Sequence, residues 1–223
     1  MDEYRPVQQE QWSPYASNGG TILAIAGDNF SVIGSDSRLS EGFQIYSRDN
    51  PKTYKLSNSL TLGCCGFHGD ALTVTRNLRT QMKVYEHVHH KEMSCQAVAQ
   101  LLSVMLYQRR FFPFYTYNIL AGLDKEGKGC IYSFDPVGSY ERETYRAGGS
   151  AASMLQPLLD NQIGYKNQEG VIKESLTIEK AVSLVQDVFT AAAERDIYTG
   201  DGLSINIVTA EGTEVREIPL RRD

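Results

Sequence analysis

Gly19-Gly20-Thr21-Ile22-Leu23-Ala24 and Gly34-Ser35-Asp36-Ser37-Arg38 are the two stretches that decide the fold of this chain. The first opens a predicted strand over residues 21–26, and the second closes a predicted strand over residues 30–35. Gly27-Asp28-Asn29 lies between them, and Gly and Asn tolerate the positive φ angles that a tight hairpin turn needs. The two strands are therefore expected to pair as a hairpin.

Composition restricts the class of protein before any motif is considered. The chain has 223 residues, of which 41% are hydrophobic and 22% charged, and this suits one globular domain or at most two small ones. The net charge of -5 argues against a nucleic-acid surface. No apolar run approaches the roughly 20 residues of a membrane span, and the polar start carries no signal-peptide core. We therefore expect no membrane partner and a location in the cytoplasm and nucleus.

The cysteines and histidines offer no metal site by their spacing. Cys64, Cys65, Cys95 and Cys130 fit no zinc-binding pattern and are expected to be buried free thiols. The run from His87 to His90 reads as a solvated helix end, because no acidic or cysteine ligand accompanies it. The sequence thus predicts neither a metal nor a cofactor.

The periodicity of apolar residues predicts strands and helices in alternating groups. Helices are expected over residues 69–90, after an N-cap at Ser94, after Gly148-Gly149 with an interruption near Pro157, and after an N-cap at Thr177. Beyond the first hairpin, strands are expected over residues 60–65, 115–123, 129–134, 140–146, 203–209 and 215–220.

This order indicates an α+β fold in which two antiparallel sheets pack face to face and helices cover their outer faces. Residues 1–18 read as an extended N-terminal arm, and residues 19–223 as a single domain. The arm is polar apart from Trp12 and Tyr15. Two aromatic rings in such a segment suggest that it packs onto its own domain or onto a neighbour.

Three motifs carry a resemblance to a known family. Asp36-Ser37-Arg38 is followed sixteen positions after Asp36 by Lys52, and Arg195-Asp196-Ile197-Tyr198-Thr199-Gly200 stands near the end of the chain. Together they resemble the beta subunits of the 20S proteasome, which belong to the N-terminal nucleophile hydrolase superfamily. The resemblance implies a four-layer αββα sandwich.

The nucleophile of that family is missing here. Active members carry a threonine at the position that counting back from the Asp36 motif places at Gly20, and glycine has no side chain to attack a carbonyl. The resemblance implies that Gly20, Asp36, Lys52, Asp196 and Thr199 form a vestigial shell without catalytic residues. Lys52 and Asp36 then read as a structural ion pair. The family's helper serine appears displaced or lost, because its turn reads Gly148-Gly149-Ser150.

Two other functions compete with a non-catalytic role. An active threonine peptidase would have to use Thr21, but successive strand side chains point to opposite faces, so Thr21 would face away from Lys52. A free-standing binding domain of the same fold is the other alternative. The arm's aromatics and those of residues 111–117 favour large protein contacts instead.

Several segments narrow the resemblance to the non-catalytic type-6 branch of the family. This branch implies a structural subunit that builds the beta ring in ubiquitin-dependent protein degradation. Its implied partners are the type-5 and type-7 beta subunits, the opposite beta ring and alpha subunits, with no nucleic acid. Asp124, in a predicted turn, is the candidate contact that shapes the chymotrypsin-like site of the neighbouring subunit; a solvated turn acid is the alternative. The segments are Pro14-Tyr15 followed by Asn18-Gly19-Gly20-Thr21-Ile22-Leu23, Arg109-Arg110-Phe111-Phe112-Pro113, Tyr132-Ser133-Phe134-Asp135-Pro136-Val137-Gly138-Ser139-Tyr140 and Pro157-Leu158-Leu159-Asp160-Asn161-Gln162.

Overall fold

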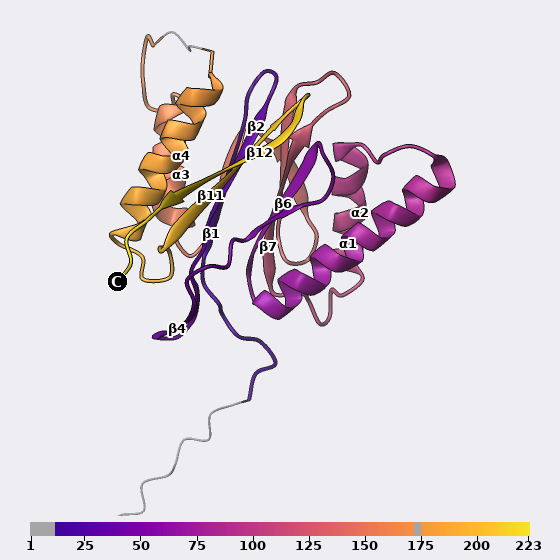
Figure 1. The fold of residues 1–223 in the computed structure, drawn as a ribbon, viewed down its shortest axis with the longest axis horizontal. Coiled ribbons are helices and arrows are strands. Elements are labelled where there is room, and N and C mark those ends of the chain that lie inside the picture. Colours follow the sequence, from indigo (N-terminus) through magenta and orange to yellow (C-terminus); the bar gives the residue numbers. More distant parts are fainter. Residues whose placement is uncertain (1–11, 172–174) are drawn as a thin grey trace, which may run out of the picture.

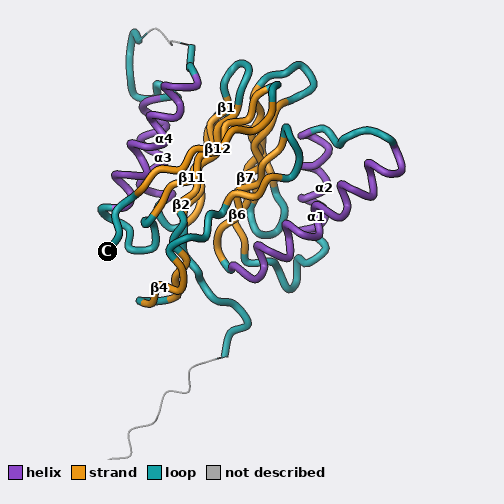
Figure 2. Tube along the Cα trace, in the orientation of Figure 1, coloured by secondary structure: helices purple, strands orange, loops and turns teal. Residues whose placement is uncertain are grey.

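Two five-stranded antiparallel sheets lie face to face between two layers of helices (Figure 1). The structure is a computed structural model, and it describes residues 12–171 and 175–223. In Figure 2 the strands form the centre, with one helix pair on each outer side. The predicted α+β architecture is therefore confirmed.

The first sheet has the strand order β10-β1-β2-β11-β12. Its first hairpin joins β1 to β2 with Ile22 opposite Ser35, as the sequence predicts. The strands are β1 (Thr21–Ala26), β2 (Ser31–Asp36), β10 (Tyr145–Gly149), β11 (Gly202–Thr209) and β12 (Gly212–Pro219).

The second sheet has the order β5-β6-β7-β8-β9, and a separate two-stranded ribbon joins β3 to β4. The short strands β3, β4 and β5 were not predicted, because three or four residues are too few for a period to show. The strands are β3 (Leu39–Glu41), β4 (Gln44–Ser47), β5 (Thr53–Lys55), β6 (Leu60–Gly66), β7 (Thr116–Leu123), β8 (Gly129–Phe134) and β9 (Tyr140–Glu143).

The helices α1 (His68–His89) and α2 (Cys95–Tyr107) cover the second sheet, and α3 (Ala152–Gln162) and α4 (Ile178–Ala193) cover the first. Both predicted N-caps are confirmed. The Ser94 hydroxyl accepts a hydrogen bond of 3.3 Å from the backbone N–H of Ala97, and the Thr177 hydroxyl accepts one of 3.3 Å from Lys180. Each cap satisfies a donor that the first helical turn leaves free.

Alternation along β1 divides its side chains between two apolar layers. Ile22 and Ala24 face the second sheet, where they pack with Ile131, whereas Leu23 and Ile25 face α3 and α4. Both faces of this strand are buried, as a central layer of a sandwich requires. Within the described residues, no helix is long and apolar enough to cross a bilayer.

Two predicted elements differ from the structure. The predicted strand over residues 140–146 is two strands, since β9 pairs with β8 while β10 pairs with β1 in the other sheet. Pro157 does not interrupt α3, which runs on through it. A proline inside a helix removes one backbone hydrogen bond, and the remaining bonds and the burial of Leu155 and Leu159 keep the helix continuous.

The predicted arm is described only from residue 12 onward, and residues 1–11 lie outside the described residues. Residues 12–18 form no helix or strand. Tyr15 packs onto its own domain: its hydroxyl donates a 2.7 Å hydrogen bond to the carbonyl of Pro113, and its ring lies 5.6 Å from that of Phe112. Trp12 is 85% exposed.

Candidate functional site

Gly20 stands immediately before β1 and has a φ of +84°, in the region that favours glycine. A Cβ atom added to Gly20 would lie 2.0 Å from Cε of Lys52 and 2.8 Å from its Nζ. Real Cβ atoms do not approach other atoms so closely. The Lys52 side chain therefore occupies the space that a side chain at position 20 would need.

Lys52 and Asp36 form a buried ion pair, as the sequence predicts. Nζ of Lys52 lies 3.0 Å from Oδ1 of Asp36, and the side chains are 4% and 0% exposed. The ammonium also donates to the backbone carbonyls of Asp36 (3.1 Å) and Arg38 (2.7 Å). An ammonium has three donors, and all three are used within the protein.

The Asp36 carboxylate is held by more than Lys52. It accepts hydrogen bonds from the backbone N–H of Thr21 (2.8 Å) and of Arg38 (3.1 Å). Burial raises the pKa of Asp36, and the positive charge of Lys52 and these hydrogen bonds only partly offset that effect. The ionised carboxylate thus depends on its ammonium partner.

Thr199, Asp196 and Ser150 form a second polar cluster. Thr199 donates a 2.7 Å hydrogen bond to Oδ2 of Asp196, and Ser150 donates one of 2.6 Å to the same oxygen. The sequence analysis expected the helper serine to be displaced or lost, and the turn before α3 brings Ser150 into this cluster. The Gly20 carbonyl lies 3.3 Å from the same hydroxyl, whose single proton is given to Asp196 at the shorter distance.

The Thr21 hydroxyl belongs to this second cluster. It lies 2.7 Å from the Thr199 hydroxyl and accepts a 3.1 Å hydrogen bond from the backbone N–H of Ala151. Because Thr199 gives its proton to Asp196, Thr21 is the donor to Thr199. Its one donor and its acceptor are thereby occupied, and the residue is fully buried. Gly20 faces Lys52 while Thr21 faces Thr199, as strand alternation predicts.

The residues before Gly20 are bound into the domain by a side chain that the sequence analysis missed. The Asn18 backbone pairs with Gly66 at 3.1 Å and with Ser40 at 3.4 Å. Its side-chain oxygen accepts a 2.8 Å hydrogen bond from the N–H of His68, at the start of α1. In a sequence, an Asn followed by two Gly residues indicates a turn. It does not show that Asn18 binds Gly66, Ser40 and His68, which are distant in the chain.

A buried charge cluster around Asp201 holds the Asp36-Ser37-Arg38 segment in place through Arg38. Nε of Arg38 lies 2.9 Å from Oδ2 of Asp201, and Arg48 binds the other oxygen of that carboxylate. Burial alone would raise the pKa of Asp201, but hydrogen bonds from the two arginines outweigh it and hold the pKa below its usual value. The sequence analysis also missed this cluster.

Asp124 lies apart from both clusters, at the turn between β7 and β8. Its Oδ1 accepts hydrogen bonds from the N–H groups of Glu126 and Lys128, both at 3.0 Å, and its Oδ2 lies 2.8 Å from Arg142. The Arg142 guanidinium lowers the pKa of this carboxyl. Asp124 therefore shapes its own turn.

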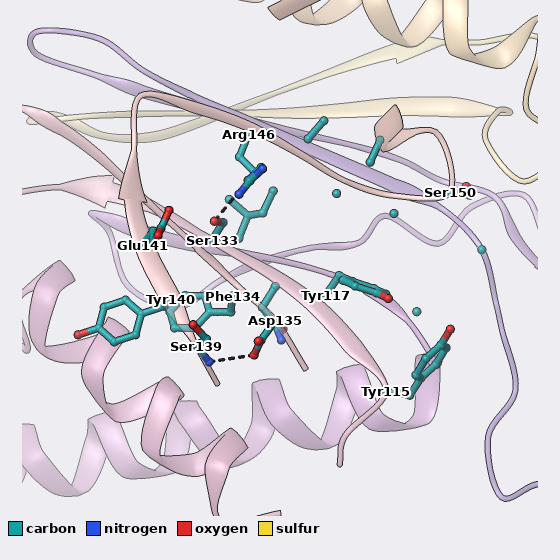
Figure 3. Close-up of a pocket in the computed structure, with 18 of the residues that line it drawn as sticks. Tyr115, Tyr117, Ser133, Phe134, Asp135, Ser139, Tyr140, Glu141, Arg146 and Ser150 are labelled. Carbon is teal, nitrogen blue, oxygen red and sulfur yellow. Dashed lines mark hydrogen bonds between the residues drawn. The ribbon is translucent and has the colours of Figure 1, made fainter. Parts of the chain in front are cut away.

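A cleft of about 690 Å³ opens beside the second cluster, and Ser150 and Gly19 border it (Figure 3). Its far wall carries Asp135, which accepts a 2.9 Å hydrogen bond from the N–H of Ser139. Tyr115 and Tyr117 stand at one end of the cleft. In residues 12–171 and 175–223, no group of three His, Cys, Asp or Glu residues is placed to hold a metal ion.

The sandwich, the buried Lys52–Asp36 pair beside Gly20 and the second polar cluster define an N-terminal-nucleophile-hydrolase-like domain. Residues 16–208 match the model of the proteasome subunit family. The chain belongs to this family, and it is a beta subunit of the 20S proteasome core, as the resemblance in the sequence implies.

Relatives from distant organisms resemble the chain along almost its whole length. "Proteasome subunit beta type-1" of Danio rerio is 58% identical over 226 residues, which cover 100% of this chain and 95% of the relative. The protein of the same name from Drosophila melanogaster is 54% identical, with 97% and 93% covered. "Proteasome subunit beta type-6" of Saccharomyces cerevisiae is 43% identical, with 96% and 93% covered. The two animal relatives are thus named beta type-1, and the yeast relative is named beta type-6.

Proposed function

We propose that this chain is a non-catalytic structural subunit of the 20S core, corresponding to the branch that is numbered type-6 in yeast. Its role is to build the beta ring in ubiquitin-dependent protein degradation in the cytoplasm and nucleus. It assembles with type-5 and type-7 beta subunits, alpha subunits and the opposite beta ring.

The observation that carries this proposal is the occupancy of the nucleophile position. The Lys52 side chain fills the space beside Gly20, so the lysine that would lower a nucleophile's pKa instead closes an ion pair with Asp36. The backbone N–H of Thr21 donates a hydrogen bond to Asp36, and the Thr21 hydroxyl is held by Thr199 and the N–H of Ala151 instead of facing Lys52.

Exposed aromatic side chains support an assembling role. Phe111 is 92% and Phe112 55% exposed, and Tyr115 and Tyr117 are also exposed. Aromatic residues are enriched in protein interfaces. Their rings continue the contacts of Tyr15, so the end of the arm and the segment after α2 form one surface.

We further propose that Asp124 helps to shape the chymotrypsin-like site of the neighbouring subunit. Its carboxylate is partly exposed, and its pair with Arg142 fixes its position on the domain surface. A charge held in this way acts on an adjoining site without the entropic cost of ordering a loose side chain.

Native mass measurement of the particle, followed by ejection and weighing of this chain, tests the structural role. A very large particle that releases a chain beginning upstream of Gly20 supports it. A chain that begins at Thr21 would instead indicate the alternative, an active N-terminal threonine peptidase. A monomer would contradict assembly.

A further inference from the structure

Cys95 and Cys130 meet inside the layer between α2 and the second sheet. Cys95 is the first residue of α2, and Cys130 lies near the start of β8. We propose that these two thiols are an oxidisable pair, which a peroxide converts into a disulfide that ties the start of α2 to β8. This modification site is separate from the Gly20 site and does not depend on the proposed function.

The strand register places the two sulfur atoms on one face of the sheet. Gly122 of β7 is the direct cross-strand partner of Cys130, and a Cβ added to Gly122 would lie 3.4 Å from Sγ of Cys95. Side chains directly opposite on antiparallel strands point to the same face, with Cβ atoms about 4.5–5.5 Å apart. The Cys95 sulfur therefore lies beside the Cys130 side chain.

The two thiols also influence each other's ionisation. The neighbouring Cys95 thiol lowers the pKa of Cys130 by stabilising its thiolate. For the same reason the pKa of Cys95 is raised. In the proposal Cys130 is therefore the attacking thiol, and Cys95, whose sulfur lies 3.4 Å from a Cβ added to the cross-strand partner of Cys130, resolves the product.

The other two cysteines provide a contrast within the same molecule. Cys64 and Cys65 are neighbours on β6, and their side chains lie in different apolar layers. Burial raises the pKa of Cys64, and it raises the pKa of Cys65 to about 12. Neither thiol faces the other, so this second pair is expected to stay reduced.

The proposed route for the oxidant runs past the ion pair between Asp124 and Arg142. Asp124 and Arg142 act electrostatically on both sulfurs, and their side chains are 18% and 50% exposed. All four cysteines are buried. Opening of the Asp124–Arg142 pair at the end of the sheet would admit a molecule as small as hydrogen peroxide.

The chemistry balances with peroxide as the only oxidant. The Cys130 thiolate attacks one peroxide oxygen, the O–O bond breaks, and the leaving hydroxide takes a proton and departs as water. Cys95 then attacks the sulfur of the resulting sulfenic acid, the S–O bond breaks, and a second water leaves. Two thiols have lost two electrons and two protons, and one peroxide has become two waters.

Peptide mapping of the full-length chain, in its assembled particle, tests the proposal. The native particle is exposed to hydrogen peroxide, unfolded, alkylated and digested, and the exposed Met154 reports by its sulfoxide that the oxidant acted. We expect a linked Cys95–Cys130 peptide that dithiothreitol separates, with Cys64 and Cys65 alkylated. Alkylation of both Cys95 and Cys130 in a sample with oxidised Met154 would overturn the proposal.

Two variants test the assigned roles. In Cys95→Ser, which keeps a hydroxyl donor beside Cys130 but cannot form the disulfide, Cys130 should accumulate as a sulfenic acid that a dimedone probe labels, and an unlabelled Cys130 would contradict its role as nucleophile. Asp124→Asn should form the linked peptide several-fold faster, because it opens the covering ion pair and leaves the Arg142 charge near the thiols. Glu179→Gln, which weakens a distant surface pair with Arg216, is the matched control and should leave the rate unchanged.

Discussion

The ammonium of Lys52 lies 3.0 Å from the carboxylate of Asp36, and the two charges are sealed in the interior beside Gly20. Lys52 fills the place that a side chain at position 20 would need. The ammonium also ties together the backbone between β2 and β3, because it donates hydrogen bonds to the carbonyls of Asp36 and Arg38.

Removal of the Lys52 charge alone should lower the free energy of unfolding more than removal of the Lys52 and Asp36 charges together. Lys52→Met leaves the buried Asp36 unpaired and should lower the free energy of unfolding by about 3–5 kcal/mol, as for other broken buried pairs. Lys52→Met combined with Asp36→Asn should recover a substantial part of this loss. Denaturant unfolding of the full-length chain measures both, and equal stabilities of the single and double variants would contradict the ion-pair interpretation.

A side chain at position 20 should be poorly tolerated. Gly20→Ala combines a positive φ with an overlap with Lys52, so we expect a loss of about 2–4 kcal/mol from backbone strain and overpacking together. Gly42→Ala is the matched control, because Gly42 also has a positive φ but nothing lies within 4 Å of its added Cβ. If the two variants have the same thermal midpoint, the overlap has no energetic consequence.

The second polar cluster should depend on the hydroxyl of Thr199 rather than on its methyl group. Thr199→Val leaves Asp196 and Thr21 each short of a partner and should cost about 1–3 kcal/mol. Thr199→Ser keeps the hydroxyl and should cost less. Thermal unfolding of the two variants measures the difference, and a Ser variant as unstable as the Val variant would show that packing of the methyl group dominates.

The Arg38–Asp201 cluster should make stability depend on pH. The pKa of Asp201 is lowered in the folded state, so its contribution is present above the unfolded value of about 3.9 and disappears as the pH falls through the folded value. Asp201→Asn should therefore destabilise the chain by about 1.5–3 kcal/mol at pH 7 and by progressively less below pH ~4.

Denaturant midpoints of wild type and Asp201→Asn, measured from neutral to acid pH, show this convergence. Asp28→Asn makes the same change of charge in the exposed β1–β2 turn and serves as the control. A constant difference between wild type and Asp201→Asn across the whole range would contradict the linkage.

Loss of Asp124 should alter one peptidase activity of the particle. Asp124→Ala should change chymotrypsin-like cleavage by up to about fivefold, as expected for one partly exposed charge, and leave the other activities unchanged. Arg142→Ala breaks the same ion pair but keeps the Asp124 carboxylate. Comparison of the two variants therefore shows whether the effect comes from the Asp124 charge itself or from its ion pair with Arg142. Unchanged kinetics of every activity in Asp124→Ala would remove Asp124 from the proposal.

Sequence periodicity predicted the long elements because each buries one regular face. The stripe from Ile178 onward gave α4, and the alternation of residues 21–26 gave β1. The contact between Lys52 and Asp36 followed from a motif whose spacing is tied to this fold. These features are decided by local pattern, and the sequence carries that pattern directly.

The missed features depend on distant partners. Residues 140–146 look like one strand, and only the pairing of Tyr140 with β8 and of Tyr145 with β1 reveals two. Comparison of Gly148-Gly149-Ser150 with the family's serine turn could not predict where the Ser150 hydroxyl lies, because the turn before α3 sets the direction of that side chain. Asp201 has a φ of +69°, which no residue pattern predicted. In this conformation its carboxylate contacts Arg38.

Thr144 is the single residue between the end of β9 and the start of β10, so the chain passes from one sheet to the other without a loop. One residue inserted or deleted here would turn the side chains of one strand to the wrong face. Evolution can lengthen or shorten most connections in a protein, but this one is fixed in length. Among relatives of this chain, gaps should be absent around position 144 even where the flanking side chains have diverged.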